Sequence, residues 1–196
     1  SYSPTGGADE VVFIGEGSET LETVFGSVAF REHDYVVVPR GPTYRFDLDD
    51  GPQTWLCLHT PGEIETPNRY RNRYGQLLEH APYCERDLHG PGDTLLVDGT
   101  DVEVLVKHRG NGPGGIVGSR MTYATHPFDV VGWDGFVYPF TFNADDFEPI
   151  TGTIHQPPPI HQTFESPGFV VCTFAPRMLD THPDAIKVPY AHSNVE

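Results

Sequence analysis

Residues that favour turns interrupt this sequence so often that it is a poor candidate for a helical fold. The 196 residues include 21 glycines and 19 prolines, roughly twice the usual combined share. Both residues are unfavourable inside helices and common in turns. With 12 Phe, 9 Tyr and 2 Trp available to fill a core, disorder is also disfavoured. The sequence therefore predicts an all-β fold of short strands joined by many turns.

The first third of the chain has the pattern of a β meander. Apolar segments of about four to six residues recur every eight to twelve residues, which is typical of a sandwich or a barrel. Strands are expected at 11–14, 21–25, 28–30, 35–38, 43–46 and 55–58.

The strand pattern is weaker after residue 60. Residues 68–78 favour one short helical stretch, and the glycine-rich segment 110–118 favours an exposed loop. Further strands are expected at 95–97, 102–106, 121–124, 130–131, 136–142 and 169–174, the last of them buried.

The charge of the chain restricts its partners. It carries 12 Lys and Arg against 28 Asp and Glu, for a formal net charge of -16. Binding to nucleic acid requires clustered basic residues, so we expect no nucleic-acid partner. No apolar run approaches the roughly 20 residues of a membrane span, so we expect no membrane partner.

The cysteines indicate a reducing compartment. Cys57, Cys84 and Cys172 are odd in number and far apart, which suggests neither a disulfide framework nor a zinc site. The first ten residues also lack the pattern of a signal peptide. We therefore expect reduced thiols and a cytoplasmic protein.

The spacing of residues 10–44 resembles the cupin superfamily, whose fold is a double-stranded β-helix, or jelly roll. Glu10 and Gly17 match the first cupin motif, although no His precedes Glu10. Pro39 and Gly41 match the second motif, and Tyr44 stands where that motif ends in His.

This departure from the cupin pattern concerns the metal ligands. A transition metal in such a barrel needs about three or four nitrogen or oxygen ligands, and at most one carboxylate remains here. We therefore expect a metal-free, structural barrel in which Glu10 is solvated or hydrogen-bonded.

Longer blocks in the second half carry a more specific resemblance. The segments at 126–135 (HPFDVVGWDG), 146–164, 168–177 and 188–196, with HAPYCERDL at 80–88, resemble the bacterial homogentisate 1,2-dioxygenases. The match extends over essentially the whole chain, in order. It implies non-haem Fe(II), O2 as co-substrate, and ring opening of homogentisate to maleylacetoacetate in tyrosine and phenylalanine catabolism.

The resemblance also assigns individual residues. His155, before the proline run, matches the family's active-site base, and Tyr190 matches a tyrosine that lines the substrate pocket. His192 matches the first iron ligand. The chemistry is consistent with these residue types, because a 2-His-1-carboxylate site leaves positions open and a neutral His can accept a phenolic proton.

The remaining ligands, a carboxylate and a second His, are expected beyond Glu196. One of three iron ligands would thus lie in this chain, so we expect no iron in it alone and no activity. We divide it into a metal-free cupin-like domain with an irregular connection (1–125) and the opening strands of a catalytic cupin domain (126–196). The resemblance further implies homo-oligomers, as trimers or hexamers.

Several alternatives stay open at this point. The substrate could be a related dihydroxy-aromatic acid such as gentisate, or the chain could belong to a non-catalytic cupin that binds a small ligand. Judged from the residues alone, His126 and Asp129 are structural, and His161 forms a hydrogen bond in an extended segment.

Overall fold

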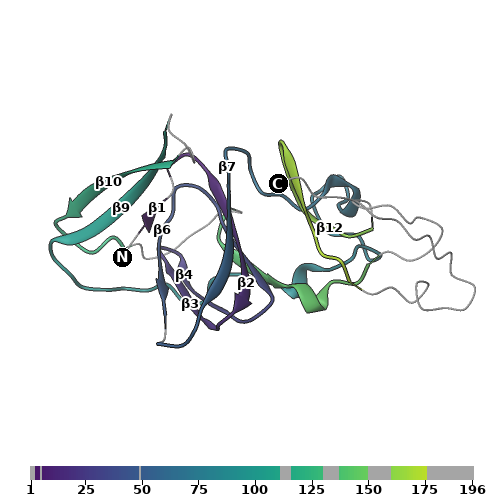
Figure 1. The fold of residues 1–196 in the computed structure, drawn as a ribbon, viewed down its shortest axis with the longest axis horizontal. Coiled ribbons are helices and arrows are strands. Elements are labelled where there is room, and N and C mark those ends of the chain that lie inside the picture. Colours follow the sequence, from purple (N-terminus) through teal and green to yellow (C-terminus); the bar gives the residue numbers. More distant parts are fainter. Residues whose placement is uncertain are drawn as a thin grey trace, which may run out of the picture.

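The computed structural model describes residues 3–4, 6–48, 50–110, 116–129, 137–149 and 160–175. Within these ranges the chain forms antiparallel strands, and its helical elements are single 3-10 turns. The turns are η1 (Asn68–Tyr70), η2 (Glu85–Asp87) and η3 (Ala144–Asp146). The predicted all-β class is therefore confirmed, and the sheets are consistent with a cupin or β-sandwich fold (Figure 1). No helix in the described ranges is long or apolar enough to cross a membrane.

Two sheets form the body of the structure. The five-stranded sheet runs in the order β7 (Thr54–Thr60), β2 (Asp9–Glu16), β5 (Asp34–Val38), β11 (Phe140–Asn143), β8 (Leu88–His89). The four-stranded sheet runs in the order β1 (Ser3–Pro4), β6 (Thr43–Asp47), β3 (Glu19–Thr23), β4 (Gly26–Phe30).

The alternation of side chains along β2 and β5 gives the five-stranded sheet two buried faces. Val12 and Val36 belong to the core of the barrel, together with Leu21 and Phe30 of the four-stranded sheet. We call this the inner face. Val11 and its partner Val37 belong to a second core on the outer face.

Aromatic side chains fill the second core. They come from the sheet, from the irregular segment between β7 and β8, and from a hairpin of β12 (Gln162–Ser166) and β13 (Phe169–Cys172). Two tyrosine hydroxyls donate to the backbone of this hairpin: Tyr70 to the Gln162 carbonyl at 2.8 Å and Tyr83 to the Thr163 carbonyl at 2.6 Å. The hairpin therefore packs on the outer face of the sheet.

A second hairpin lies at the opposite end of the molecule (Figure 1). It consists of β9 (Val102–Arg109) and β10 (Ile116–Tyr123), paired over their full length. The Gly6 amide donates to the Lys107 carbonyl at 2.8 Å, which joins β9 to the N-terminal part of the barrel.

The strands of the meander are confirmed, since the six predicted segments correspond to β2 through β7. Several later predictions are wrong. Residues 95–97 form no strand, and residues 116–118 belong to β10 instead of a loop. The strand predicted at 169–174 ends at Cys172, and its Val170 is 46% exposed.

The short helix expected within 68–78 is limited to the single turn η1. The Asn72 side chain accepts hydrogen bonds from the amides of Tyr74 and Gln76, and Gly75 has a φ of +85°. This local turn competes with helix continuation for the same amides.

The predicted division after residue 125 stays a prediction. β11, which follows that point in the chain, pairs with β5 in the five-stranded sheet.

Candidate functional site

Four polar side chains meet at the inner face. Glu10 of β2 lies directly opposite His59 of β7 in the sheet register. Tyr44 of β6, in the four-stranded sheet, and Lys107 of β9, in the β9–β10 hairpin, approach the same carboxylate. We call Glu10, Tyr44, His59 and Lys107 the Glu10 cluster.

The four side chains of the Glu10 cluster contact one another at short distances. Glu10 Oε1 accepts from Lys107 Nζ at 2.7 Å and lies 2.8 Å from His59 Nδ1. The Tyr44 hydroxyl donates to Glu10 Oε2, and Lys107 Nζ donates to the Tyr44 hydroxyl at 2.7 Å. The predicted hydrogen bonding of Glu10 is therefore confirmed.

Electrostatics favour the ionised form of Glu10. Its side chain is 3% exposed, and this burial alone would raise the pKa of the carboxyl group. Hydrogen bonds from Lys107 and Tyr44, with the positive charge of Lys107, outweigh burial and hold the pKa of Glu10 below its ordinary value. The cluster thus stabilises a buried carboxylate with a cation that belongs to the chain itself.

The Glu10 cluster is a poor metal site. Its carboxylate, imidazole and phenol are of ligand type, but the Lys107 ammonium is bound directly to two of them. In the described ranges, no group of three His, Cys, Asp or Glu side chains is arranged to hold a metal ion. The residues that the structure describes therefore do not fit an iron centre.

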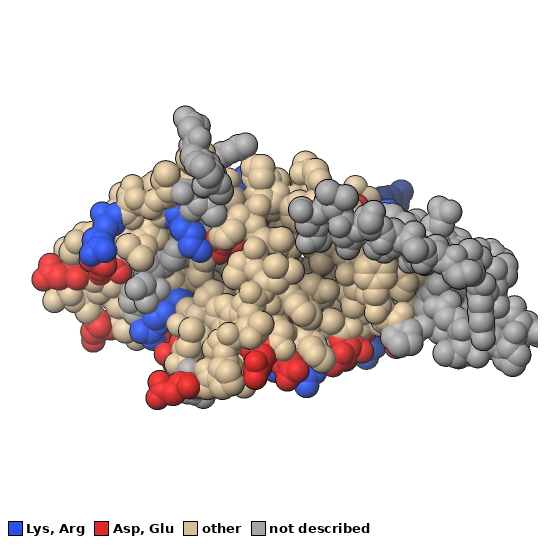
Figure 2. Space-filling model, in the orientation of Figure 1, with Lys and Arg blue, Asp and Glu red and all other residues tan. Residues whose placement is uncertain are grey.

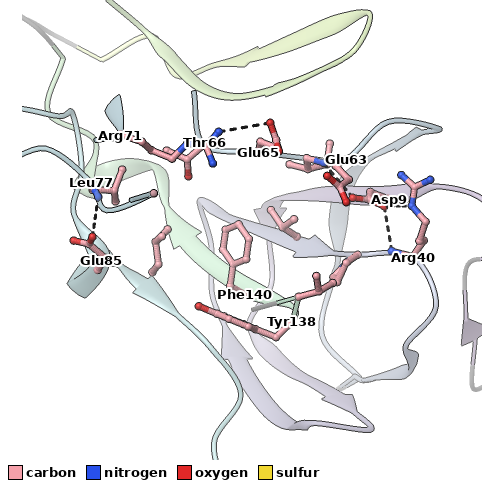
Figure 3. A pocket seen from close by; sticks show the side chains of 16 residues that line it. Asp9, Arg40, Glu63, Glu65, Thr66, Arg71, Leu77, Glu85, Tyr138 and Phe140 are labelled. Carbon is pink, nitrogen blue, oxygen red and sulfur yellow. Dashed lines mark hydrogen bonds and ion pairs between the residues drawn. The ribbon is translucent and has the colours of Figure 1, made fainter. Parts of the chain in front are cut away.

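A cavity of about 430 Å³ opens on the outer face of the sheet. Figure 3 shows Phe140 and Tyr138 on one side of it and the charged pair Glu65 and Arg71 on the other. At one end, Asp9 accepts from the Arg40 amide and Nε, at 3.1 and 2.8 Å. We call this space the outer cavity; its size lies within the range of about 300–1,000 Å³ that is usual for small-molecule sites.

The three site residues assigned from the sequence, His155, Tyr190 and His192, lie outside the described residues. Two other predictions can be compared with the structure. His161 is buried, and its Nδ1 lies 3.0 Å from the Thr173 carbonyl oxygen, so the expected hydrogen bond is confirmed. The residue lies in the turn before β12, however, and not in an extended segment. His126 is also buried, and its Nδ1 accepts from the Phe128 amide at 3.0 Å, as expected for a structural residue.

Sequence reasoning missed Lys107, His59 and the outer cavity. Lys107 carried a usable signal, since it is one of two lysines in the chain and follows a predicted strand. The position of His59 follows from the alternation of side chains along β7: it lies two residues after Cys57 and therefore on the same face of the sheet. The cavity joins segments distant in sequence and left no local signal.

The three cysteines are free thiols, as predicted. Cys57 is exposed, but partial desolvation, followed by the negative charge of Glu10, raises the pKa of its thiol, which keeps it protonated and weakly nucleophilic. On the face shown in Figure 2, basic side chains are interspersed with acidic ones.

Comparison with known proteins shows that the chain is similar in sequence to proteins named as dioxygenases. The chain is 39% identical to a Saccharolobus solfataricus protein named as a dioxygenase, over 96% of this chain and 47% of that protein. It is 29% identical to homogentisate 1,2-dioxygenase of Rhodopseudomonas palustris strain BisB5, over 81% of this chain and 34% of the enzyme. For strain BisA53 the identity is 26%, over 95% of this chain and 41% of the enzyme.

The chain therefore spans between a third and about half the length of these curated relatives. No protein-family model matches it.

Proposed function

We propose that this chain is part of an Fe(II)-dependent dioxygenase that opens the ring of homogentisate with O2 to give maleylacetoacetate. The observation that carries the proposal is the 39% identity to a dioxygenase-named protein across 96% of the chain. The choice of homogentisate rests on the weaker similarity to the homogentisate 1,2-dioxygenases and on the blocks at 126–135 and 188–196.

In this proposal the catalytic chemistry belongs to the second half of the chain. His155 accepts the phenolic proton of the substrate, Tyr190 lines the substrate pocket, and His192 supplies one iron ligand. The other ligands come from residues beyond Glu196. The first barrel is a non-catalytic support, which agrees with the Lys107 ammonium bound within the Glu10 cluster.

The decisive experiment measures oxygen consumption with homogentisate by the longest native protein that contains these residues. His155→Ala is expected to lower kcat by at least about 100-fold, the usual contribution of a general base. His89→Ala is the matched control, because His89 is exposed and is not among the described residues that line the outer cavity or form the Glu10 cluster. Full turnover by His155→Ala would contradict the assignment of the base.

The same assay separates the substrates. Homogentisate and gentisate are offered in parallel at equal concentrations, and homogentisate is expected to give the higher kcat/KM. Preference for gentisate would assign the protein to the related reaction, and failure to consume oxygen with either acid would favour a non-catalytic cupin.

We also propose that the protein assembles as a trimer or hexamer of identical subunits, on the basis of the family resemblance. Sedimentation velocity at several concentrations tests this, and a monomer at every concentration would contradict it.

A further inference from the structure

The walls of the outer cavity are held in place without a ligand. The Glu65 amide and carbonyl pair with the backbone of Glu165, at 2.9 and 2.8 Å. The Ile64 amide donates to Asp9 Oδ2 at 3.1 Å, and the Leu77 amide donates to Glu85 Oε1 at 2.8 Å. A cavity with such fixed walls is preorganised, so little ordering cost would accompany binding.

One side of the cavity is apolar and aromatic. Phe140 pairs with Val37 across β11 and β5, so both side chains lie on the outer face of the sheet. Figure 3 shows Tyr138 beside Phe140. Elsewhere in the lining, Ile64 and Leu77 add apolar surface. This side suits an aromatic or aliphatic group.

The opposite side carries an oppositely charged pair, Glu65 and Arg71, whose side chains do not hydrogen-bond to each other. Arg71 Nη2 lies 3.6 Å from Glu65 Oε2, which is beyond hydrogen-bonding distance. The same Nη2 donates to Asn68 Oδ1 at 2.7 Å, which orients the guanidinium group. Arg71 Nε is buried without a hydrogen-bond partner in the part of the chain that the structure describes. The hydrogen-bonding capacity of this pair is therefore not saturated.

The charges around the cavity select among possible ligands. Asp9, Glu63, Glu65 and Glu85 face two guanidinium groups, so a simple carboxylic acid would enter an unfavourable field. A simple amine would satisfy Glu65 but leave Arg71 facing a second positive charge. A zwitterion has no net charge and can place its carboxylate at Arg71 and its ammonium group at Glu65.

We propose that the outer cavity binds a free α-amino acid with an apolar side chain. The carboxylate and ammonium groups of the ligand pair with Arg71 and Glu65, and its side chain packs on Phe140 and Tyr138. The proposed amino-acid site is assigned from described residues only and does not depend on the roles proposed for His155, Tyr190 and His192.

The first test compares three ligands that share a phenyl ring on a two-carbon chain, on the unmodified chain, by isothermal titration calorimetry. The ligands are L-phenylalanine, 3-phenylpropionate, which lacks the ammonium group, and 2-phenylethylamine, which lacks the carboxylate. L-phenylalanine is expected to bind at least about tenfold more tightly than either, the loss expected for one charge-assisted hydrogen bond. Equal binding of either analogue, or no saturable binding of L-phenylalanine, would overturn the proposal.

The second test uses charge-matched variants. Arg71→Gln and Glu65→Gln are each expected to weaken L-phenylalanine binding by about tenfold. Arg69→Gln and Glu79→Gln, which change exposed residues outside the cavity, are expected to leave it unchanged. A loss of similar size in the control variants would refute the site, and the ligand comparison remains decisive if Arg71→Gln does not fold.

Discussion

Glu10 and Glu65 are both carboxylates beside the five-stranded sheet, but they lie on opposite faces and differ in their partners. Glu10, on the inner face, is bound by Tyr44 and Lys107 at hydrogen-bonding distance. Glu65, on the outer face, lies 3.6 Å from Arg71, and the pair borders a cavity. The difference teaches that a buried charge satisfied by the chain serves stability, whereas an open charge pair beside a cavity is available to a ligand.

Removing the internal cation is expected to have the largest effect. Lys107→Met leaves the Glu10 carboxylate buried without its strongest donor. Breaking a buried ion pair costs about 3–5 kcal/mol, and the lower end applies because the Lys107 side chain is 32% exposed. Urea unfolding measures the free-energy change.

The control for this variant lies on the same hairpin. Arg120 pairs with Glu103 at 3.0 Å, but both side chains are well exposed. Arg120→Met is therefore expected to cost less than about 1 kcal/mol. Equal losses in the two variants would remove the distinction between the Glu10 cluster and an ordinary surface pair.

Removing a single hydroxyl group tests how the β12–β13 hairpin is held to the outer face. Tyr83→Phe removes the donor to the Thr163 carbonyl and leaves that buried acceptor unsatisfied. The expected cost is about 1–3 kcal/mol by urea unfolding. Tyr74→Phe is the matched control, since Tyr74 is 72% exposed, and no change is expected there. A neutral Tyr83→Phe would mean that the hydroxyl contacts do not hold the hairpin to the outer face.

A smaller effect concerns pH on the inner face. Because the folded-state pKa of Glu10 lies below its ordinary value of 4.5, the carboxylate stabilises the fold fully above that value. This contribution is lost as the pH falls through the folded-state pKa. The difference in unfolding free energy between the native chain and Glu10→Gln is therefore expected to shrink on acidification, and a constant difference would contradict the assignment.

The smallest expected effect is at the exposed pair of His33 and Asp145, which gives a reference for the effects on the two faces of the sheet. Hydrogen bonding to Asp145, at 3.0 Å from His33 Nδ1, raises the pKa of His33 above its ordinary value of 6.5. Asp145→Asn is expected to lower that pKa in an NMR titration with little change in stability. An unchanged titration would mean that the two side chains do not interact in solution.

Much of the barrel could be predicted because its signals are local. Continuous apolar runs at 11–14 and 35–38, bounded by turn residues, define β2 and β5. The prediction failed where tertiary contacts override local pattern. Residues 95–97 have strand-like composition but pair with no strand in the described ranges, and the Asn72 side chain forms a local turn where the helix was expected to continue after Tyr70.

The candidate catalytic residues illustrate another limit. His155, Tyr190 and His192 were assigned from motif resemblance, and they remain predictions because they lie outside the described residues. His161 could be assessed directly, because it lies among the described residues and its Nδ1 contacts the Thr173 carbonyl oxygen.

The sequence by itself determined the all-β class, the strands of the meander and the alternation that places Glu10 and Val11 on opposite faces. Only the tertiary structure decided that Lys107, 97 residues away, reaches Glu10, and that Glu65 and Arg71 border a cavity above Phe140. The physical reason is that periodicity specifies which face of a strand a side chain occupies. It does not specify which distant segment packs against that face, because long-range contacts depend on how the whole chain closes.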